Sequence, residues 1–255
     1  MNDQPVLTER RDNVLLVTLN RPDARNAVNG ALAQGVADAL DELDATPELQ
    51  VGVLTGAGKG FSAGMDLKAF VTGERPWVGD RGFAGIVQRT SRKPLIAAVE
   101  GFAVAGGFEV ALACDLIVAA RGANLGIPEV KRSVVAAGGA LLRLPRRMPY
   151  GLAMELALTG DPIDAERAYE LGVVNRLAEP GGAVEAALEL AATIAKNGPL
   201  VLDATKAVLQ RQFDWTEEEF WQKQGELAGP VFTSEDAREG ATAFAEKREP
   251  VWKGR

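Results

Sequence analysis

Short apolar runs of strand length alternate with helix-forming segments through the first half of the chain. Leucine, valine and alanine recur at helical spacing from Asn29 to Leu43, and a second helix is predicted from Gly106 to Cys114. The predicted strands are Val14–Asn20, Val51–Thr55, Leu95–Val99 and Leu116–Ala120. Because strands separated by helices pair in parallel and are buried on both faces, the pattern predicts an α/β fold with a largely parallel sheet.

The pattern becomes helical in the last third of the chain. Helices are predicted at Ala183–Ala195, Leu200–Gln210, Thr216–Leu227 and Glu235–Ala245. A loop is predicted earlier, from about Phe70 to Gly82. The sequence Asn197-Gly198-Pro199 interrupts the helices, so we expect an α/β core over residues 1–197 and a helical C-terminal region over residues 198–255.

Two absences narrow the possible chemistry. The 255 residues include no histidine and one cysteine, Cys114. This composition excludes Ser-His-Asp and Cys-His catalysis, internal disulfides, and metal sites built on histidine or thiolate clusters. An enzyme of this composition must use carboxylates, lysine or tyrosine as acids and bases, and backbone amides or cations as electrophiles. We expect no metal ion.

The charge and the distribution of carboxylates bear on partners and location. A formal net charge of −7 disfavours a general nucleic-acid or anionic-membrane binder. The most apolar stretch, Ile96–Ala120, contains Glu100, Glu109 and Asp115, and each would cost roughly 2.5–3.5 kcal/mol at the centre of a bilayer. The N-terminal segment MNDQPVLTERRDN has no apolar stretch typical of a signal peptide. We therefore expect a cytoplasmic protein without a membrane segment.

The glycine-rich segment Thr55–Ser62 does not match a nucleotide-binding loop. A Walker A loop would place glycine at Val53 and a hydroxyl residue at Gly60. Phe61 occupies the third glycine position of a dinucleotide-binding motif. A flexible turn between a strand and a loop is the simpler interpretation.

Two later segments could present backbone amides to a ligand. Small residues at positions 62–64 allow close approach of the backbone, and the following amide belongs to Met65. Asp66 could cap the next turn. In the second segment a strand runs into Ala105-Gly106-Gly107, where a helix begins and leaves its first N–H groups free for an anion.

Two glutamates lie among apolar residues. Glu109 occupies the first turn of the predicted 106–114 helix, and Glu129 follows Pro128 in the segment LGIPEV. Burial of both would suit acid–base chemistry. The alternatives are that Glu109 complements the helix dipole at the surface, and that Glu129 pairs with Lys131 or Arg132 in an exposed loop.

Taken together, these segments resemble the enoyl-CoA hydratase/isomerase (crotonase) superfamily, over most of the chain. The matching stretches are NRPDARNAV (20–28), FSAGMDL (61–67), AVEGFAVAGGFEVALACDLIVAA (98–120), LGIPEVKRSVVAAGGALLRLPRRM (125–148), ALTGDPIDAERAYELGVVNRL (157–177) and SEDAREGATAFAEKREP (234–250). The resemblance implies a crotonase-like spiral of ββα units with a helical C-terminal region.

The resemblance also implies a reaction and the roles of four residues. In such proteins the thioester oxygen lies between two backbone N–H groups, here those of Met65 and Gly106. The hydratases use two glutamates, and both positions are filled, by Glu109 and Glu129. The implied activity is reversible syn addition of water across the 2,3 double bond of an enoyl-CoA. Glu109 would deprotonate the water and Glu129 would protonate the α-carbon. No cofactor is implied, since coenzyme A belongs to the substrate.

Further residues are implied in binding the acyl-CoA. They are Ala24, Arg25, Ala63, Gly64, Asp66, Leu67, Lys68, Gly107 and Lys247. Lys247 and the neighbouring Arg248 could come from the same or an adjacent subunit, because family members assemble as trimers or pairs of trimers. The C-terminal region is expected to serve oligomerisation and to cover the active site. Met65, Phe108 and the loop containing Trp77 depart from many relatives, so acyl specificity stays open.

Three other functions compete with hydration. An isomerase or another lyase of the same fold would use the same site without net addition of water. A non-catalytic acyl-CoA-binding or scaffolding protein should have lost the glutamates or Gly106, and neither is lost. A nucleic-acid-binding relative is disfavoured by the acidic charge.

Overall fold

The main sheet contains six strands and forms the centre of the protein. In the computed structural model, which describes residues 4–255, the strand order is β1-β2-β3-β6-β8-β11. The strands are β1 (Val6–Arg11), β2 (Val14–Leu19), β3 (Val51–Gly56), β6 (Leu95–Val99), β8 (Leu116–Ala120) and β11 (Arg176–Ala178). Only the β1–β2 pair is antiparallel. The predicted α/β fold with a largely parallel sheet is confirmed.

Helices cover both faces of this sheet. α1 (Gly30–Ala45) and α3 (Gly106–Ala113) pack with alternate strand residues such as Leu15 and Val17 in one core cluster. α7 (Ala183–Ala195) packs on the opposite face, against residues such as Val53 and Ile96. This two-sided burial explains why β2, β3, β6 and β8 are continuous apolar runs in the sequence.

A second, smaller sheet lies beside the first and was not predicted. It consists of β7 (Phe102–Val104), β9 (Asn124–Gly126) and β10 (Ile163–Asp164) in the order β10-β9-β7. β7 and β9 are parallel, with Val104 opposite Gly126. An isolated parallel bridge joins Ser62 to Ala103 on the other edge of β7. Strands of two or three residues are too short to show a periodic pattern.

Shorter elements lie between the strands of the two sheets and, in the case of η4, between α8 and α9. The helices are α2 (Leu67–Val71), α4 (Ala140–Arg147), α5 (Tyr150–Thr159) and α6 (Ala165–Glu170). The 3-10 helices are η1 (Pro22–Ala24), η2 (Gly79–Arg81), η3 (Pro128–Arg132) and η4 (Gln212–Asp214), and a hairpin pairs β4 (Trp77–Val78) with β5 (Gly82–Phe83). The prediction of a loop over residues 70–82 was therefore wrong in part, because the end of α2, β4 and η2 lie within it.

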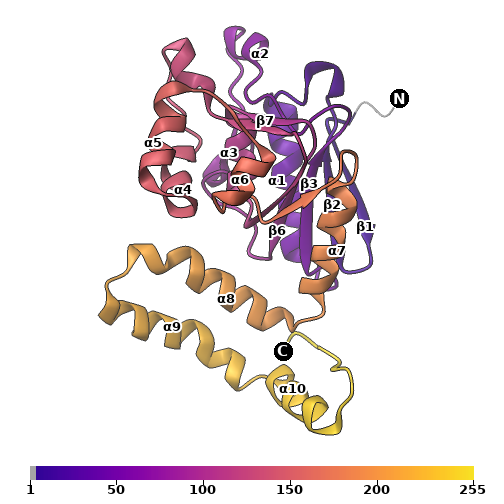
Figure 1. Cartoon of the computed structure of the whole chain (residues 1–255). Helices are drawn as coiled ribbons and strands as arrows, with labels where there is room; N and C mark the ends of the chain where they lie inside the picture. The colour runs from indigo at the N-terminus through magenta and orange to yellow at the C-terminus, as the bar shows by residue number, and fades with distance from the viewer. Residues whose placement is uncertain (1–3) are drawn as a thin grey trace.

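Three helices extend away from the core as a C-terminal arm, residues 199–255 (Figure 1). They are α8 (Pro199–Arg211), α9 (Glu217–Phe232) and α10 (Glu235–Glu246). The predicted helices of this region all form, and α7 packs on the main sheet. The division of the chain into two regions at residue 197 stays a prediction. Within residues 4–255, no helix combines the length and apolarity needed to cross a bilayer.

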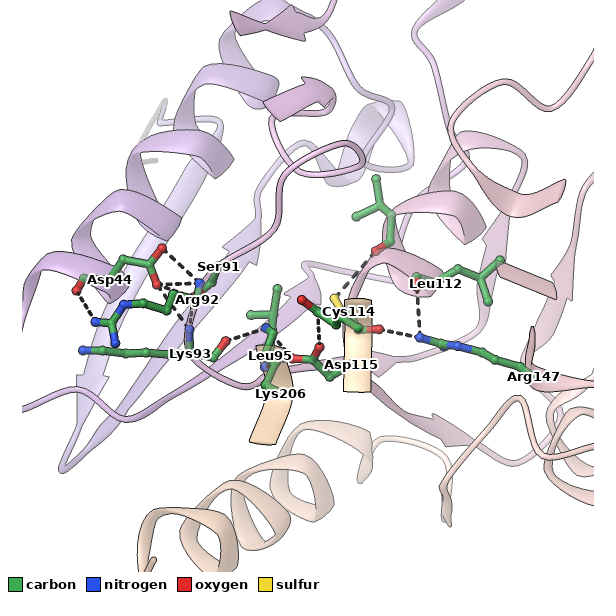
Figure 2. A network of polar contacts seen from close by, with 12 residues as sticks. Asp44, Ser91, Arg92, Lys93, Leu95, Leu112, Cys114, Asp115, Arg147 and Lys206 are labelled. Carbon is green, nitrogen blue, oxygen red and sulfur yellow. Dashed lines mark hydrogen bonds and ion pairs between the residues drawn. The ribbon is translucent and has the colours of Figure 1, made fainter. Parts of the chain in front are cut away.

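A buried lysine joins the arm to the core. Lys206 of α8 donates to the carbonyl oxygen of Lys93 at 2.7 Å and forms an ion pair with Asp115 at 2.6 Å (Figure 2). The carboxylate of Asp115 also accepts the amide of Leu95, the first residue of β6. The arm is therefore fixed to the ends of two central strands.

Candidate active site

Three adjacent parallel segments carry the predicted site residues just beyond their carboxyl ends. The segment around Ser62 leads to Met65, β7 leads to Gly106, and β9 leads to Glu129 in η3. The amide of Ala105 donates to the carbonyl oxygen of Gly126 at 2.9 Å and holds the ends of β7 and β9 together. Residues distant in sequence thus meet at one edge of the small sheet, where ligands bind in many α/β proteins.

The backbones at Gly64 and Gly106 are in close contact. Gly64 has a φ of +90°, and a Cβ added there would lie 2.8 Å from the amide nitrogen of Gly106. The neighbouring amides are engaged, that of Gly64 with Ser62 Oγ and that of Asp66 with the carbonyl oxygen of Val28. Within residues 4–255, the amides of Met65 and Gly106 donate no hydrogen bond. Two free donors therefore lie side by side.

The turn into α3 is strained and tightly packed. Ala105 adopts φ 52° and ψ −134°, a conformation that costs a residue with a side chain roughly 1–3 kcal/mol. A Cβ on Gly107 would lie 2.2 Å from the carbonyl oxygen of Ser62, so only glycine fits there. Strain of this kind persists where the surrounding structure enforces it, and it lets α3 begin directly at the end of β7.

Glu109 is buried, so the alternative of a surface residue that complements the helix dipole is wrong. The residue is 4% exposed, and Oε1 accepts the amide of Ala140, the first residue of α4, at 3.1 Å. Burial raises the pKa of the Glu109 carboxyl. The hydrogen bond from Ala140 and the nearby charge of Arg143 oppose that shift. The Glu109 carboxyl is thus held in one orientation with its pKa above the ordinary value.

Glu129 is half-buried. The alternative of an ion pair with Lys131 or Arg132 is wrong, because Lys131 pairs with Asp161 and no ion pair of residues 4–255 joins Glu129 to Arg132. Glu129 Oε2 is buried without a hydrogen-bond partner in the described part of the chain. Burial, reinforced by the charge of Glu109, raises the pKa of Glu129 to about 7. The two carboxyls therefore influence each other's protonation, as carboxylate pairs in catalytic sites do.

An apolar cavity of about 390 Å³ adjoins Glu129. Its other lining residues belong to η3, α4, α5 and the adjoining loop, and include Val134, Leu141, Met154 and Leu158. A charged carboxylate beside such a surface is poorly solvated, which is consistent with the raised pKa of Glu129.

Most of the residues predicted to bind the acyl-CoA lie together. The segment containing Ala24 and Arg25 runs beside residues 63–66, because the amide of Ala63 donates to the carbonyl oxygen of Arg25 at 3.0 Å. Arg25 and Lys68 are exposed, and so is Leu67. The carboxylate of Asp66 caps α2, as the sequence suggested, by accepting the amides of Lys68 and Ala69.

Lys247 is separate from this group. It directly follows α10, which lies at the opposite end of the molecule from α2 (Figure 1). A single chain therefore does not bring Lys247 to the other predicted ligand-binding residues. Phe108, one of the departures from many relatives, is fully buried in the core, whereas Met65 is only partly buried.

Sequence reasoning missed three groups that hold the site in place. Asn26 is fully buried and donates to the carbonyl oxygens of Ala57 and Gly60, each at 2.9 Å. Ser62 Oγ donates to the carbonyl oxygen of Asn26 at 2.8 Å. The amide of Ala140 orients Glu109. A polar residue in a predicted loop gives no sign of such burial, so nothing in the sequence distinguished these residues.

Known proteins of similar sequence and structure agree with this architecture. The family model described as enoyl-CoA hydratase/isomerase matches residues 9–255, and the chain belongs to that family. It is 42% identical to a carnitinyl-CoA dehydratase of Salmonella typhimurium over 254 residues, which cover 96% of this chain and 97% of the relative. It is also 42% identical to enoyl-CoA hydratase EchA19 of Mycobacterium tuberculosis over 259 residues, covering 98% and 96%.

Solved structures give the same assignment. The crystal structure of enoyl-CoA hydratase EchA1 from Mycobacterium marinum is 57% identical, matches with a TM-score of 0.98, and covers 99% of this chain and all of that one. An enoyl-CoA hydratase from Mycobacterium tuberculosis H37Rv has a TM-score of 0.97 at 57% identity over 99% of this chain and 100% of that one. These matches establish the crotonase fold.

Proposed function

We propose that this protein is an enoyl-CoA hydratase, a hydro-lyase that reversibly adds water syn across the 2,3 double bond of an enoyl-CoA thioester. The observation that carries the proposal is the presence of two free, adjacent amides close to two coupled glutamates, of which Glu109 is buried and Glu129 is half-buried. The names of the relatives include both hydratases and a dehydratase, which run this chemistry in opposite directions. The reaction needs no redox or group-transfer cofactor, because coenzyme A enters as part of the substrate.

The amides of Met65 and Gly106 form the oxyanion hole. The thioester oxygen accepts both hydrogen bonds, which makes the β-carbon electrophilic. Attack by water leaves an enolate whose negative charge rests on that oxygen. The position of Gly106 at the start of α3 adds the partial positive charge of a helix N-terminus. Because these donors are already in place, they stabilise the enolate without reorganisation.

The glutamates transfer the protons. Ionised Glu109 takes one proton from water as the oxygen bonds to the β-carbon, and protonated Glu129 gives a proton to the α-carbon as the enolate collapses. One H and one OH are thereby added to the same face. Glu109 is left protonated and Glu129 ionised, and transfer of one proton from Glu109 to Glu129 restores the starting state. Their raised pKa values suit this exchange near neutral pH.

Arg25 and Lys68 bind the coenzyme A phosphates, together with backbone contacts from Ala24, Ala63, Gly64, Asp66, Leu67 and Gly107. The support is the position of two exposed cations beside the 63–68 segment in an otherwise acidic protein. Lys247 contributes from a neighbouring subunit, since it directly follows α10, which lies at the opposite end of its own chain from α2 (Figure 1).

The functional protein is a homotrimer or a dimer of trimers, in which the C-terminal arm serves oligomerisation and covers an active site. Large apolar side chains support this assignment, because Phe213, Trp221, Phe232 and Phe244 of the arm are between 59% and 89% exposed. Exposed apolar surface of this kind marks interaction sites. Light scattering after size exclusion measures the mass, and a monomer at micromolar concentration would contradict this assignment.

A cytoplasmic location stays a prediction.

The decisive experiment is turnover of short, long and branched enoyl-CoAs with identification of the product. Hydration removes the conjugated chromophore and yields a 3-hydroxyacyl-CoA. An isomerase would give a product of unchanged mass, and a non-catalytic binding protein would give none. Either result would contradict the proposal.

A further inference from the structure

Arg147 holds the C-terminal end of the helix that carries Gly106 and Glu109. It is the last residue of α4, and its Nη2 donates to the carbonyl oxygens of Leu112 and Cys114 at 3.0 and 2.6 Å (Figure 2). Within residues 4–255 these are the only hydrogen bonds of its guanidinium, which forms no ion pair. The guanidinium therefore makes its hydrogen bonds only to the C-terminal end of α3.

This contact satisfies groups that would otherwise be costly to bury. Every residue of α3 is buried, and the last carbonyls of a helix have no partner within it. A cation at this position also complements the negative end of the helix dipole. On the other side, Asp115 is held by Lys206 and by the amide of Leu95. The end of α3 is thus fixed between α4 and β6.

α4 contacts α3 a second time, at the catalytic carboxyl. The first amide of α4, that of Ala140, donates to Glu109, while the last residue of α4 donates to the end of α3. The two helices are therefore joined at both ends of α4. Any shift of α4 along α3 would change the hydrogen bond on Glu109 and the contacts at the C-terminal end of the helix that begins with Gly106.

We propose that Arg147 is a positioning residue for the hydration reaction, fixing α3 and α4 so that Ala140 orients Glu109 and Gly106 faces the substrate oxygen. The proposal rests on the function proposed above. Arg147 acts at the far end of α3 and touches neither substrate nor carboxyl.

Arg147→Met tests the proposal, with Arg146→Gln as the matched control. Arg146 is the preceding residue of α4 but is exposed, and it contacts Asp214 and Phe213 in the arm. A displacement of about 1 Å can cost 10²-fold in rate, so we expect kcat of R147M on crotonyl-CoA to fall about 10- to 100-fold with little change in KM. R146Q should retain the parental kcat, although it loses the same charge.

The pH profile of kcat/KM distinguishes a positioning role of Arg147 from a role in the stability of the fold alone. If R147M weakens the hydrogen bond from Ala140, ionised Glu109 loses a stabilising donor, and the acid limb of kcat/KM moves to higher pH. Hydrogen exchange of the α3 amides should become faster in R147M and remain parental in R146Q. R147K keeps the charge on a single ammonium group and should give intermediate values.

The proposal is overturned if folded R147M has the parental kcat and acid limb, or if R146Q loses as much activity as R147M. If R147M does not fold, R147K provides the test instead. The proposal is then overturned if R147K has the same acid limb of kcat/KM and the same hydrogen exchange of the α3 amides as the parent. If the parent itself hydrates no enoyl-CoA, the proposed function fails. The exchange measurement then still shows whether Arg147 fixes α3.

Discussion

Gly64 lies so close to Gly106 that a Cβ on Gly64 would be 2.8 Å from the Gly106 amide nitrogen. A real Cβ would push apart the backbone segments that present the Met65 and Gly106 amides. Loss of one oxyanion donor typically costs about 10²–10³ in rate, so Gly64→Ala should reduce kcat by about that factor. Gly181→Ala is the control, because Gly181 has a φ of +85° with open space around it. Equal kcat in the two variants would contradict the proposed oxyanion hole.

Substitution of either catalytic glutamate should lower kcat, whereas substitution of a third carboxylate from the same apolar stretch of sequence should not. Glu109→Gln and Glu129→Gln should each lower kcat about 10²–10⁴-fold, the range for general acid–base groups. Glu100→Gln is the control: Glu100 accepts the amides of Gly181 and Ala183 at the start of α7, so it should affect stability alone. Steady-state rates with crotonyl-CoA make the comparison. Near-parental turnover of E109Q or E129Q would show that glutamate to be structural.

The pH dependence of hydration follows from the two raised pKa values. Glu109 must be ionised to accept a proton, so kcat/KM should fall below its pKa, which lies above 4.5. Glu129 must be protonated to donate, so kcat/KM should fall as pH rises through about 7. The expected profile is a bell, measured with initial rates from pH 5 to 9. An unchanged alkaline limb in the residual activity of Glu129→Gln would show that another group titrates there.

Lys206→Met should destabilise the protein strongly. It removes the cation from a buried ion pair and leaves Asp115 without its charge partner, a change that typically costs about 3–5 kcal/mol. Lys253→Met breaks the exposed pair with Glu235 and should change the free energy of unfolding by only about 0.2–1 kcal/mol. Urea unfolding of both variants gives the two values. Similar changes in the free energy of unfolding would mean that the Lys206–Asp115 pair contributes no more to stability than an exposed ion pair.

Removal of the proposed phosphate contacts should affect only substrates that carry the nucleotide. Arg25→Ala combined with Lys68→Ala should raise KM for crotonyl-CoA severalfold, because two charge-assisted contacts are lost. The KM for crotonyl-pantetheine, which lacks the nucleotide, should not change. A parallel rise with both substrates would instead indicate damage to the acyl site.

Local sequence patterns predicted the catalytic side chains of the candidate site but not the residues that hold them in place. The resemblance and the motifs identified Glu109 and Glu129, and the absence of histidine confined acid–base chemistry to groups of this kind. The neighbouring supports were not predictable. Asn26, Ser62 and Arg147 have no periodicity that marks them, and their roles depend on which backbone carbonyls the fold brings to them.

The sequence alone determined the four central strands β2, β3, β6 and β8 and the helices α1, α3 and α7–α10, since apolar runs and helical spacing are local properties of the chain. It also determined which residues were available for catalysis. Only the tertiary structure decided that Met65 and Gly106 present neighbouring free amides and that both glutamates are withdrawn from water. Those relations depend on the register of β7 and β9 and on the strained turn at Ala105. Such short segments acquire their conformation from the packing around them.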